Sequence, residues 1–344
     1  MANSQSNNDN NYYTEPESVR PSKDGSLKFS PIEIPVILFT VWVLFSNLTL
    51  ILAILRSEHR RKISFNLHVC NLCVVGLLLG GLVLPLLMEF RLRDVWFHDE
   101  NLCRVWLMAD MMVSTVSILT IGVMIFDRFV LFSCPGSAEG GCKFVVSAIL
   151  IILPWAGGAS IVLPVYLFGE TGSGVVEGYC FLHLEPVYSI ASELAGYAVP
   201  GLAALGLLVA TTLTFCVRRE ELREMDYSEE REHKGWQVLM LWIMSLAVLG
   251  LWCPFAVLHV LIFFAPGTPS FYSWLTFAIW SGYANAGLNP ILWMIMPKLR
   301  QSVKALCCCC YKHRYDDDED DVSVFEEDDE TNAAMIEFHP KNYN

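Results

Sequence analysis

One carboxylate, Asp110, lies inside a long apolar stretch, Val105–Leu131. A carboxylate at membrane depth is costly unless it is paired, and it is by default a functional residue. The alternative is an internal salt bridge, but the outer halves of the other apolar stretches contain no Lys or Arg to form one. We therefore expect Asp110 to pair with a cation that a ligand brings.

Aromatic side chains that can pack around a bound cation occur further along the chain. They are Trp252 and Phe255 in the sixth apolar stretch, and Trp280 and Tyr283 in the seventh. Aromatic ring faces attract cations, although each ring taken alone is also typical of the core of a large helix bundle. With Asp110 and with Ser114, one turn further along the same stretch, they form a candidate ligand site.

Seven apolar stretches must position these side chains. Each is long enough to cross about 30 Å of hydrocarbon, which takes about 20 helical residues. They are Pro35–Leu55, Phe65–Leu87, Val105–Leu131, Phe144–Phe168, Ile190–Val217, Trp236–Phe264 and Phe271–Met296. Because they are continuously apolar and do not alternate with a period of two, they predict helices and not barrel strands. The expected fold is an all-α membrane protein, a seven-transmembrane helix bundle with a short amphipathic helix after the seventh span.

Composition and charge agree with this fold. Of the 344 residues 54% are hydrophobic and 17% are charged, which excludes an ordinary soluble domain of this size. The net charge of −13 belongs largely to the acidic run 315–330 and does not describe a binding surface. We expect a disordered extracellular amino terminus (1–34), a helical domain (35–306), and a cysteine cluster with a disordered acidic tail (307–344).

Basic residues predict the orientation of the bundle. Lys and Arg cluster after the first stretch, between the fifth and sixth, and after the seventh, although Arg91 and Arg93 follow the second. Such basic loops stay in the cytoplasm. We therefore expect a multi-pass protein of the plasma membrane with an extracellular amino terminus and a cytoplasmic carboxyl terminus.

Several short motifs follow one another in a fixed order along these stretches. They are Cys103, Asp127-Arg128-Phe129, Trp252-Cys253-Pro254 and Asn289-Pro290-Ile291-Leu292-Trp293, with Asn47, Trp155 and Pro200 in the first, fourth and fifth stretches. Cys103 and Arg128 are separated by roughly 37 Å of helix, so one helix runs from the outer face to the cytoplasm. Together the motifs resemble the rhodopsin-like (class A) family of G-protein-coupled receptors over roughly residues 35–310.

The resemblance implies a receptor whose ligand binds outside and which activates a heterotrimeric G protein inside. The residues implied in coupling and switching are Asp127, Arg128, Asn289, Pro290 and Trp293. The segment 280–285 resembles the biogenic-amine branch, where the tyrosine hydroxyl orients the carboxylate. A small ammonium is then expected between Asp110 and Tyr283, whereas an opsin needs a lysine at position 283.

Polar residues of the fifth stretch would contact the far end of such a ligand. Ser192 and Glu193 lie about two turns before Pro200. Glu193 has three possible environments: the site, a neighbouring helix, or headgroup water at an exposed helix end. Facing the site with His259 near, it would suit a ligand with two separated donors, such as an imidazole-ethylamine or a diamine.

Two cysteines are placed for a disulfide bond. Cys103 and Cys180 both face the oxidising side, and a bridge would hold the outer loop over the mouth of the bundle. Two free thiols are the alternative, and the resemblance favours the bridge.

Other functions remain as alternatives. A peptide or another non-amine ligand would suit the acidic, tyrosine-containing amino terminus, and an atypical receptor would couple weakly or constitutively. The spans contain no metalloprotease or nucleophile-elbow motif, and a transporter would usually show repeats or paired broken helices. We expect no enzyme activity, no catalytic residue, no metal, no cofactor and no nucleic-acid partner.

Four positions depart from the family pattern. Gly76 stands where an aspartate is normal, so a sodium ion loses its main anionic ligand. Leu208 and Trp293 replace two tyrosines that stabilise the active state, and Lys234 replaces a glutamate facing Arg128. We expect weak or absent sodium modulation and measurable basal signalling.

The segment 297–306 after the seventh stretch predicts an amphipathic helix on the inner lipid surface. It is followed directly by Cys307, Cys308, Cys309 and Cys310. Cysteines beside such a helix are palmitoylation candidates, whereas adjacent cysteines cannot easily surround a zinc ion. The acidic tail is either a solvated segment or a permanent mimic of phosphates that arrestin would bind.

Overall fold

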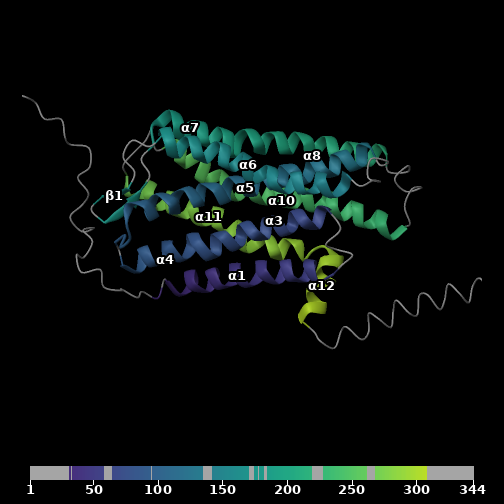
Figure 1. Ribbon diagram of the computed structural model, residues 1–344, viewed down its shortest axis with the longest axis horizontal. Coiled ribbons are helices and arrows are strands. Elements are labelled where there is room, and N and C mark those ends of the chain that lie inside the picture. Colours follow the sequence, from purple (N-terminus) through teal and green to yellow (C-terminus); the bar gives the residue numbers. More distant parts are fainter. Residues whose placement is uncertain are drawn as a thin grey trace, which may run out of the picture.

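The computed structural model describes residues 31, 33–57, 64–93, 95–134, 142–169, 174–176, 178–181, 184–218, 228–261 and 268–307. Long helices lie side by side along one axis (Figure 1). In chain order they are α1 (Glu33–Arg56), α3 (Ser64–Leu78), η2 (Leu79–Val83), α4 (Leu84–Arg93), α5 (Glu100–Ser133), α6 (Cys142–Pro164), η4 (Val165–Gly169), α7 (Pro186–Glu193), η5 (Leu194–Ala198), α8 (Val199–Val217), α10 (Ser228–Leu261), α11 (Pro269–Trp293) and α12 (Pro297–Cys307). The η segments are single π-helical turns that continue the neighbouring α-helices. We call the end where α5 begins the outer end and the opposite end the inner end.

The helices form seven spans, which confirms the expected all-helical bundle. Six of them are long and apolar enough to cross a membrane, and α11 is not among these six. Its 25 residues suffice for a crossing. Asn285 and Asn289 make its sequence more polar, and both are buried inside the bundle.

Local sequence determines where the spans begin. The helix α5 starts at Glu100, before the expected Val105, because the Asp99 carboxylate accepts a hydrogen bond from the Leu102 N–H at 2.8 Å. Thr268 caps α11 in the same way, by accepting from the Phe271 N–H at 3.2 Å. The spans therefore extend past their apolar segments into polar caps.

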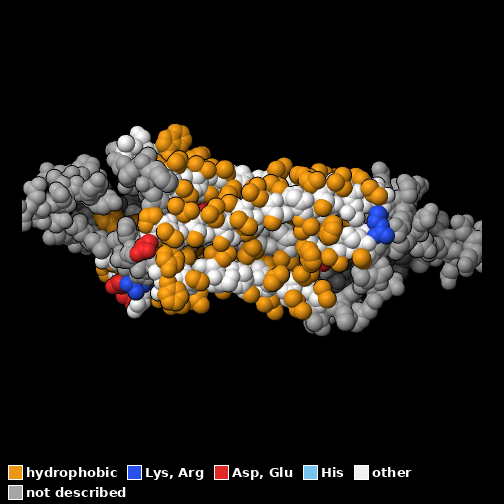
Figure 2. Space-filling view, turned by 90° about the horizontal axis from the view of Figure 1, so that it is seen from above, with side chains coloured by type: hydrophobic (Ala, Val, Ile, Leu, Met, Phe, Trp, Pro, Cys, Tyr) orange, Lys and Arg blue, Asp and Glu red, His pale blue; other side chains and the backbone are white. Residues whose placement is uncertain are grey.

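Polar side chains lie inside the bundle and apolar ones cover its surface. Hydrophobic side chains cover most of the face shown in Figure 2, and charged groups gather near its two ends. Inside, Trp155 donates to Asn71 Oδ1 at 2.8 Å, and Asn71 Nδ2 donates to Thr120 Oγ1 at 3.2 Å. Because hydrocarbon cannot satisfy polar groups, this hydrogen-bonded chain holds α6, α3 and α5 together.

A β-hairpin lies at the outer end of the bundle. It consists of β1 (Gly174–Val176) and β2 (Tyr179–Phe181), which pair antiparallel with Val175 opposite Cys180. Gly178 in its turn has φ 84°, and a Cβ there would lie 2.4 Å from a Val95 methyl, so only glycine fits. Cys180 is bonded to Cys103 near the start of α5. The disulfide bond expected from the sequence is thus confirmed.

Candidate functional site

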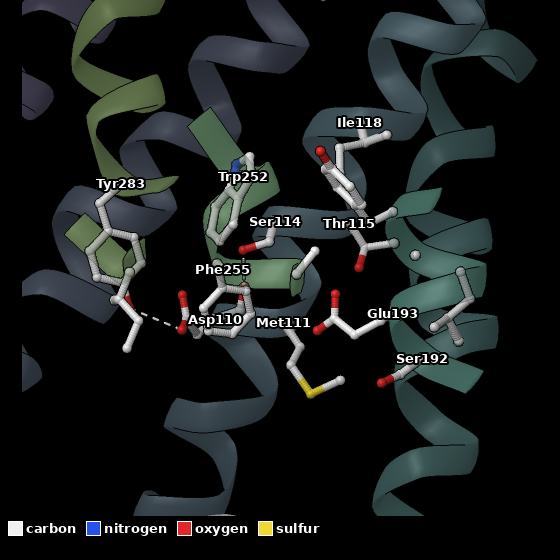
Figure 3. A pocket seen from close by; sticks show the side chains of 15 residues that line it. Asp110, Met111, Ser114, Thr115, Ile118, Ser192, Glu193, Trp252, Phe255 and Tyr283 are labelled. Atoms are coloured by element: carbon white, nitrogen blue, oxygen red, sulfur yellow. Dashed lines mark hydrogen bonds between the residues drawn. The ribbon is translucent and has the colours of Figure 1, made fainter. Parts of the chain in front are cut away.

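A cavity of about 80 Å³ lies in the outer half of the bundle. Its lining residues are Asp110, Met111, Ser114, Thr115, Ile118, Ile161, Ser192, Glu193, Gly196, Tyr197, Trp252, Phe255, Ala256, Ile279 and Tyr283. Figure 3 shows side chains from α5, α10, α11 and the α7–η5 span directed toward a common space. Of the nine predicted ligand-site residues, only His259 and Trp280 do not line this cavity.

Asp110 is the charged group on the α5 side of the cavity. Its Oδ2 accepts a hydrogen bond from the Tyr283 hydroxyl at 2.9 Å. Its Oδ1 is buried and has no hydrogen-bond partner among the described residues. The Ser114 hydroxyl donates to the Asp110 main-chain oxygen at 2.8 Å and not to the carboxylate. None of the lining residues is Lys or Arg.

Aromatic rings enclose the space beside Asp110. The Trp252 ring meets Phe255 and Tyr283 edge to face, with centroid distances of 5.9 and 6.4 Å. Trp280 does not line the cavity. Its ring packs edge to face against Tyr283, with a centroid distance of 5.8 Å, and helps to hold the tyrosine ring in place. A Cβ at Gly282 would lie 2.6 Å from the Trp252 ring. Glycine at this position therefore lets α10 and α11 approach closely.

The wall opposite Asp110 also carries a carboxylate. Glu193 Oε1 lies 2.7 Å from His259 Nδ1, and His259 Nε2 lies 3.4 Å from the Ser189 hydroxyl. The His259 ring stacks on Phe255 with a centroid distance of 5.2 Å. Ser192 lines the cavity, but its hydroxyl donates to the Ser189 main-chain oxygen at 2.8 Å. The structure thus places Glu193 at the cavity and His259 behind it.

Several lining residues were not identified from the sequence. Met111, Thr115 and Ile118 share one face of α5 by i, i+4 and i+7 spacing, and this face lies beside the one that carries Asp110 and Ser114. Tyr197 lies in the π-helical turn η5 and donates to the Leu249 main-chain oxygen at 2.5 Å. The sequence shows no signal for this contact, because it depends on how the two spans cross.

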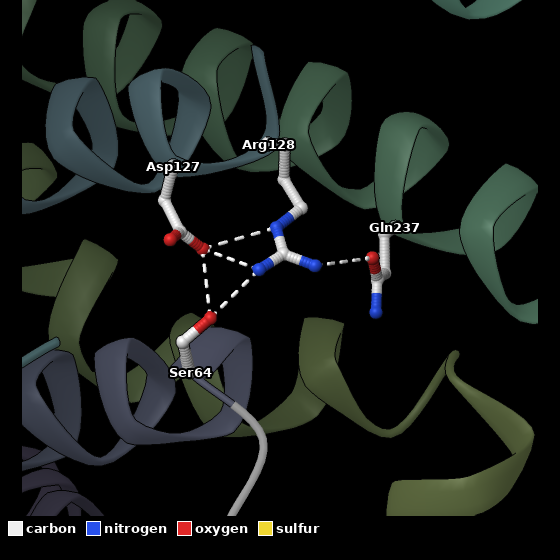
Figure 4. Close-up of polar contacts among 4 residues, drawn as sticks. All are labelled: Ser64, Asp127, Arg128 and Gln237. Carbon is white, nitrogen blue, oxygen red and sulfur yellow. Dashed lines mark hydrogen bonds and ion pairs between the residues drawn. The ribbon is translucent and has the colours of Figure 1, made fainter. Parts of the chain in front are cut away.

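A second polar cluster surrounds Arg128 at the inner end of α5. Arg128 is ion-paired with Asp127, donates to the Ser64 hydroxyl at 2.7 Å, and donates to Gln237 Oε1 at 3.2 Å (Figure 4). Its guanidinium also lies over the Phe65 ring, 5.6 Å from the centroid. Gln237, one turn after Lys234 on α10, was not identified from the sequence. From the sequence, position 234 was expected to face Arg128. In the structure Gln237 makes the contact with Arg128 from α10.

The predicted switch residues of α11 lie in the interior. Asn289 and Trp293 are buried, and neither Asn289 Oδ1 nor Trp293 Nε1 has a hydrogen-bond partner among the described residues. Pro290 lies between them inside α11. Trp293 packs edge to face against Phe65 at 5.7 Å. Apolar packing therefore holds this part of the bundle.

A second, smaller cavity of about 10 Å³, the inner cavity, has Ser114, Trp252 and Asn289 in its lining. Its lining also includes Gly76, Ser117 and Asn285. No residue that lines this cavity is Asp or Glu. A Cβ at Gly76 would lie 2.7 Å from the Asn47 side chain. Asn47 thus fills the space that a side chain at position 76 would need.

The predicted acylation sites lie at the end of the described chain. Cys307 is the last residue of α12, and Cys308, Cys309 and Cys310 lie outside the described residues, as do the amino-terminal segment 1–30 and the acidic tail. Their predicted roles remain predictions.

Comparisons with known proteins agree with this arrangement. Residues 46–293 match the family model described as 7 transmembrane receptor (rhodopsin family). The D(1B) dopamine receptor of Xenopus laevis is 27% identical, over 79% of this chain and 68% of that receptor. The D(5)-like dopamine receptor of Takifugu rubripes is 26% identical, over 76% of this chain and 63% of that receptor. The 5-hydroxytryptamine receptor 4 of Cavia porcellus is 24% identical, over 74% and 73%.

Proposed function

We propose, from the premise that the chain belongs to the rhodopsin family of seven-transmembrane receptors, that it binds a small amine and activates a heterotrimeric G protein. Membership of this family makes the chain a multi-pass membrane receptor and not an enzyme. Its relatives named for dopamine and 5-hydroxytryptamine support an amine as the ligand. In this proposal the amino terminus is extracellular and the carboxyl terminus is cytoplasmic.

The observation that carries the proposal is the unpaired oxygen of Asp110. Oδ1 is buried beside aromatic rings, while Oδ2 is held by Tyr283. A ligand ammonium would supply the missing charge and hydrogen bond, and the ring faces of Trp252 and Phe255 would favour the same cation.

Signal transfer would be a shift between two states of the bundle. Trp252 in the cavity and Gln237 at the Arg128 cluster both belong to α10. A ligand that moves Trp252 would move this helix and weaken the contact between Gln237 and Arg128. Arg128 would then be available to the G protein. Arrestin and membrane lipid are further proposed partners, through the tail and α12.

The test is a panel of small amines, read out as G-protein activation by wild type and by Asp110→Asn. Loss of the charge should weaken amine binding by about 2–5 kcal/mol, which is roughly 30-fold to several thousandfold, and amine potency should fall with it. The control is Glu185→Gln, which removes an exposed carboxylate at the outer end of α7. Equal potency in wild type and Asp110→Asn at matched surface expression would reject the proposal.

Constitutive coupling is a second candidate, favoured by the cluster at Arg128. Gln237 is a neutral partner where a glutamate would form an ion pair, and buried Leu208 offers no hydrogen bond. The α5–α10 contact at Arg128 is therefore a hydrogen bond to a neutral acceptor and not an ion pair, and Leu208 gives the active state no hydrogen bond. Basal G-protein activation equal to that of mock membranes would reject this candidate.

A further inference from the structure

Two carboxylates face a single cavity in the outer half of the bundle. Asp110 comes from α5 and Glu193 from the end of α7, and both line the cavity. Figure 3 shows them on opposite sides, with Met111 and Phe255 between them in that view. Since none of the lining residues is Lys or Arg, the described part of the cavity wall supplies no permanent positive charge.

The Tyr283 hydroxyl that holds Asp110 carries no charge, and the His259 ring beside Glu193 carries one only when it is protonated. Asp110 accepts one hydrogen bond, from the uncharged Tyr283 hydroxyl, and its other oxygen is buried without a described partner. Glu193 is paired with His259 alone among the described residues. A neutral imidazole that donates from Nδ1 provides a hydrogen bond but no charge.

The surroundings of Glu193 hold its partner in one orientation. The His259 ring is stacked on Phe255, and its second nitrogen lies 3.4 Å from the Ser189 hydroxyl. The Glu193 side chain is 16% exposed. A fixed, mostly buried carboxylate interacts strongly with a second charge because the local dielectric constant is low.

We propose that the cavity selects a ligand with two cationic groups, one bound by Asp110 and the other by Glu193. This inference rests on the proposed function and specifies its ligand class as a diamine. Met111, Phe255 and Ala256 line the space as apolar groups, so the spacer between the two ammonium groups is aliphatic or otherwise apolar. A ligand with one ammonium leaves Glu193 with His259 as its partner among the described residues, whereas a second ammonium adds an ion pair at a site of low dielectric constant.

The experiment compares α,ω-diaminoalkanes, from 1,3-diaminopropane to 1,8-diaminooctane, with n-alkylamines of equal carbon number. Binding is read from the thermal stability of the full-length receptor in lipid nanodiscs, since a ligand of the folded state raises stability with its concentration. For wild type we expect one diamine length to bind on the order of 30-fold more tightly than its matched monoamine.

Two substitutions separate the carboxylates, and a third controls for general charge effects. Glu193→Gln should bring the ratio of diamine to monoamine affinity close to one while monoamine binding persists, which also shows that the variant is folded. The control Glu185→Gln removes an exposed carboxylate outside the cavity lining, and it should keep the wild-type ratio. A ratio near one in wild type at every length, an unchanged ratio in Glu193→Gln, or no binding of any diamine overturns the inference.

The Asp110→Asn variant distinguishes this inference from the proposed function. Loss of both diamine and monoamine binding supports Asp110 as the shared ammonium site. Monoamine binding that survives in Asp110→Asn contradicts the proposed function itself. If monoamine binding depends on Asp110 but wild type shows no preference for diamines, the proposed function stands. The inference that Glu193 binds a second cationic group is then rejected.

Discussion

At the scale of single residues, Asn47 determines what position 76 can hold. Its Nδ2 donates to the main-chain oxygens of Val43 and Ala286, at 2.8 and 3.1 Å. These two bonds fix the amide 2.7 Å from where a Cβ of residue 76 would lie. A glycine at this position is therefore matched to its neighbour, and the adjacent inner cavity has no lining carboxylate.

We predict that sodium leaves amine affinity unchanged. A hard cation needs oxygen ligands with compensating negative charge, and the inner cavity offers only hydroxyl, amide and main-chain oxygens. The measurement is amine binding in sodium chloride against N-methylglucamine chloride at equal ionic strength. A clear drop in agonist affinity with sodium alone would contradict the prediction.

At the scale of elements, α10 and α11 pack closely where the Trp252 ring of α10 lies against Gly282 of α11. The Trp252 ring occupies the space that a side chain at Gly282 would need. The same ring contacts Phe255 and Tyr283 and lines the cavity. The spacing between the two helices and the shape of the site therefore depend on one contact.

We predict that Gly282→Ala lowers the stability of the receptor. The new methyl would lie about 2.6 Å from the ring, and such overpacking costs about 1–3 kcal/mol. The measurement is thermal unfolding of the purified receptor. The matched control is Gly250→Ala on α10, where a Cβ meets nothing within 4 Å and a gain of about 0.5–1 kcal/mol is expected. Equal stability of the two variants would contradict the prediction.

The contact between α5 and α10 at the inner end leads to a second prediction on elements. Gln237→Ala removes an acceptor from Arg128 and should raise basal G-protein activation about two- to tenfold. Gln237→Glu adds a charged acceptor and should lower it. The control is Leu239→Ala on the exposed side of α10. Basal nucleotide exchange at matched surface expression measures the effect, and the same change in both Gln237 variants would contradict it.

The register of the fifth span shows where sequence reasoning stops. Helical spacing from Pro200 left the direction of Glu193 open. The π-helical turn η5, Leu194–Ala198, lies between the two residues and adds a residue to the turn, which rotates every side chain before it. By contrast, the direction of Asp110 follows from burial alone, because a carboxylate in an apolar helix must face the interior.

At the scale of the whole molecule, the sequence predicted the seven helical spans because hydrocarbon requires long apolar helices. It predicted seven of the fifteen residues that line the cavity, because a polar residue in such a helix must face the interior and the family motifs marked the aromatic ones. Contacts between distant spans, such as Arg128 with Gln237 and Asn47 beside Gly76, were not predictable. They depend on crossing geometry, which side-chain packing decides.

A disulfide bond joins the outer hairpin to the start of α5. We predict that replacing both Cys103 and Cys180 by serine destabilises the receptor by about 2–4 kcal/mol, because the bridge closes a long loop. Thermal unfolding under non-reducing conditions provides the measurement. Cys216→Ser, which removes an exposed free thiol, should leave stability unchanged. A double variant as stable as this control would contradict the prediction.

The fit between Asn47 and Gly76 also restricts the evolutionary paths open to this receptor. A single Gly76→Asp mutation would bring the new side chain into collision with a neighbour fixed by two hydrogen bonds. A single change to a smaller residue at position 47 would open a void and leave the Ala286 oxygen without this donor. Each step alone is disfavoured, so the two positions can change only as a pair. The absence of a carboxylate at the inner cavity is thus a state that single mutations do not readily reverse.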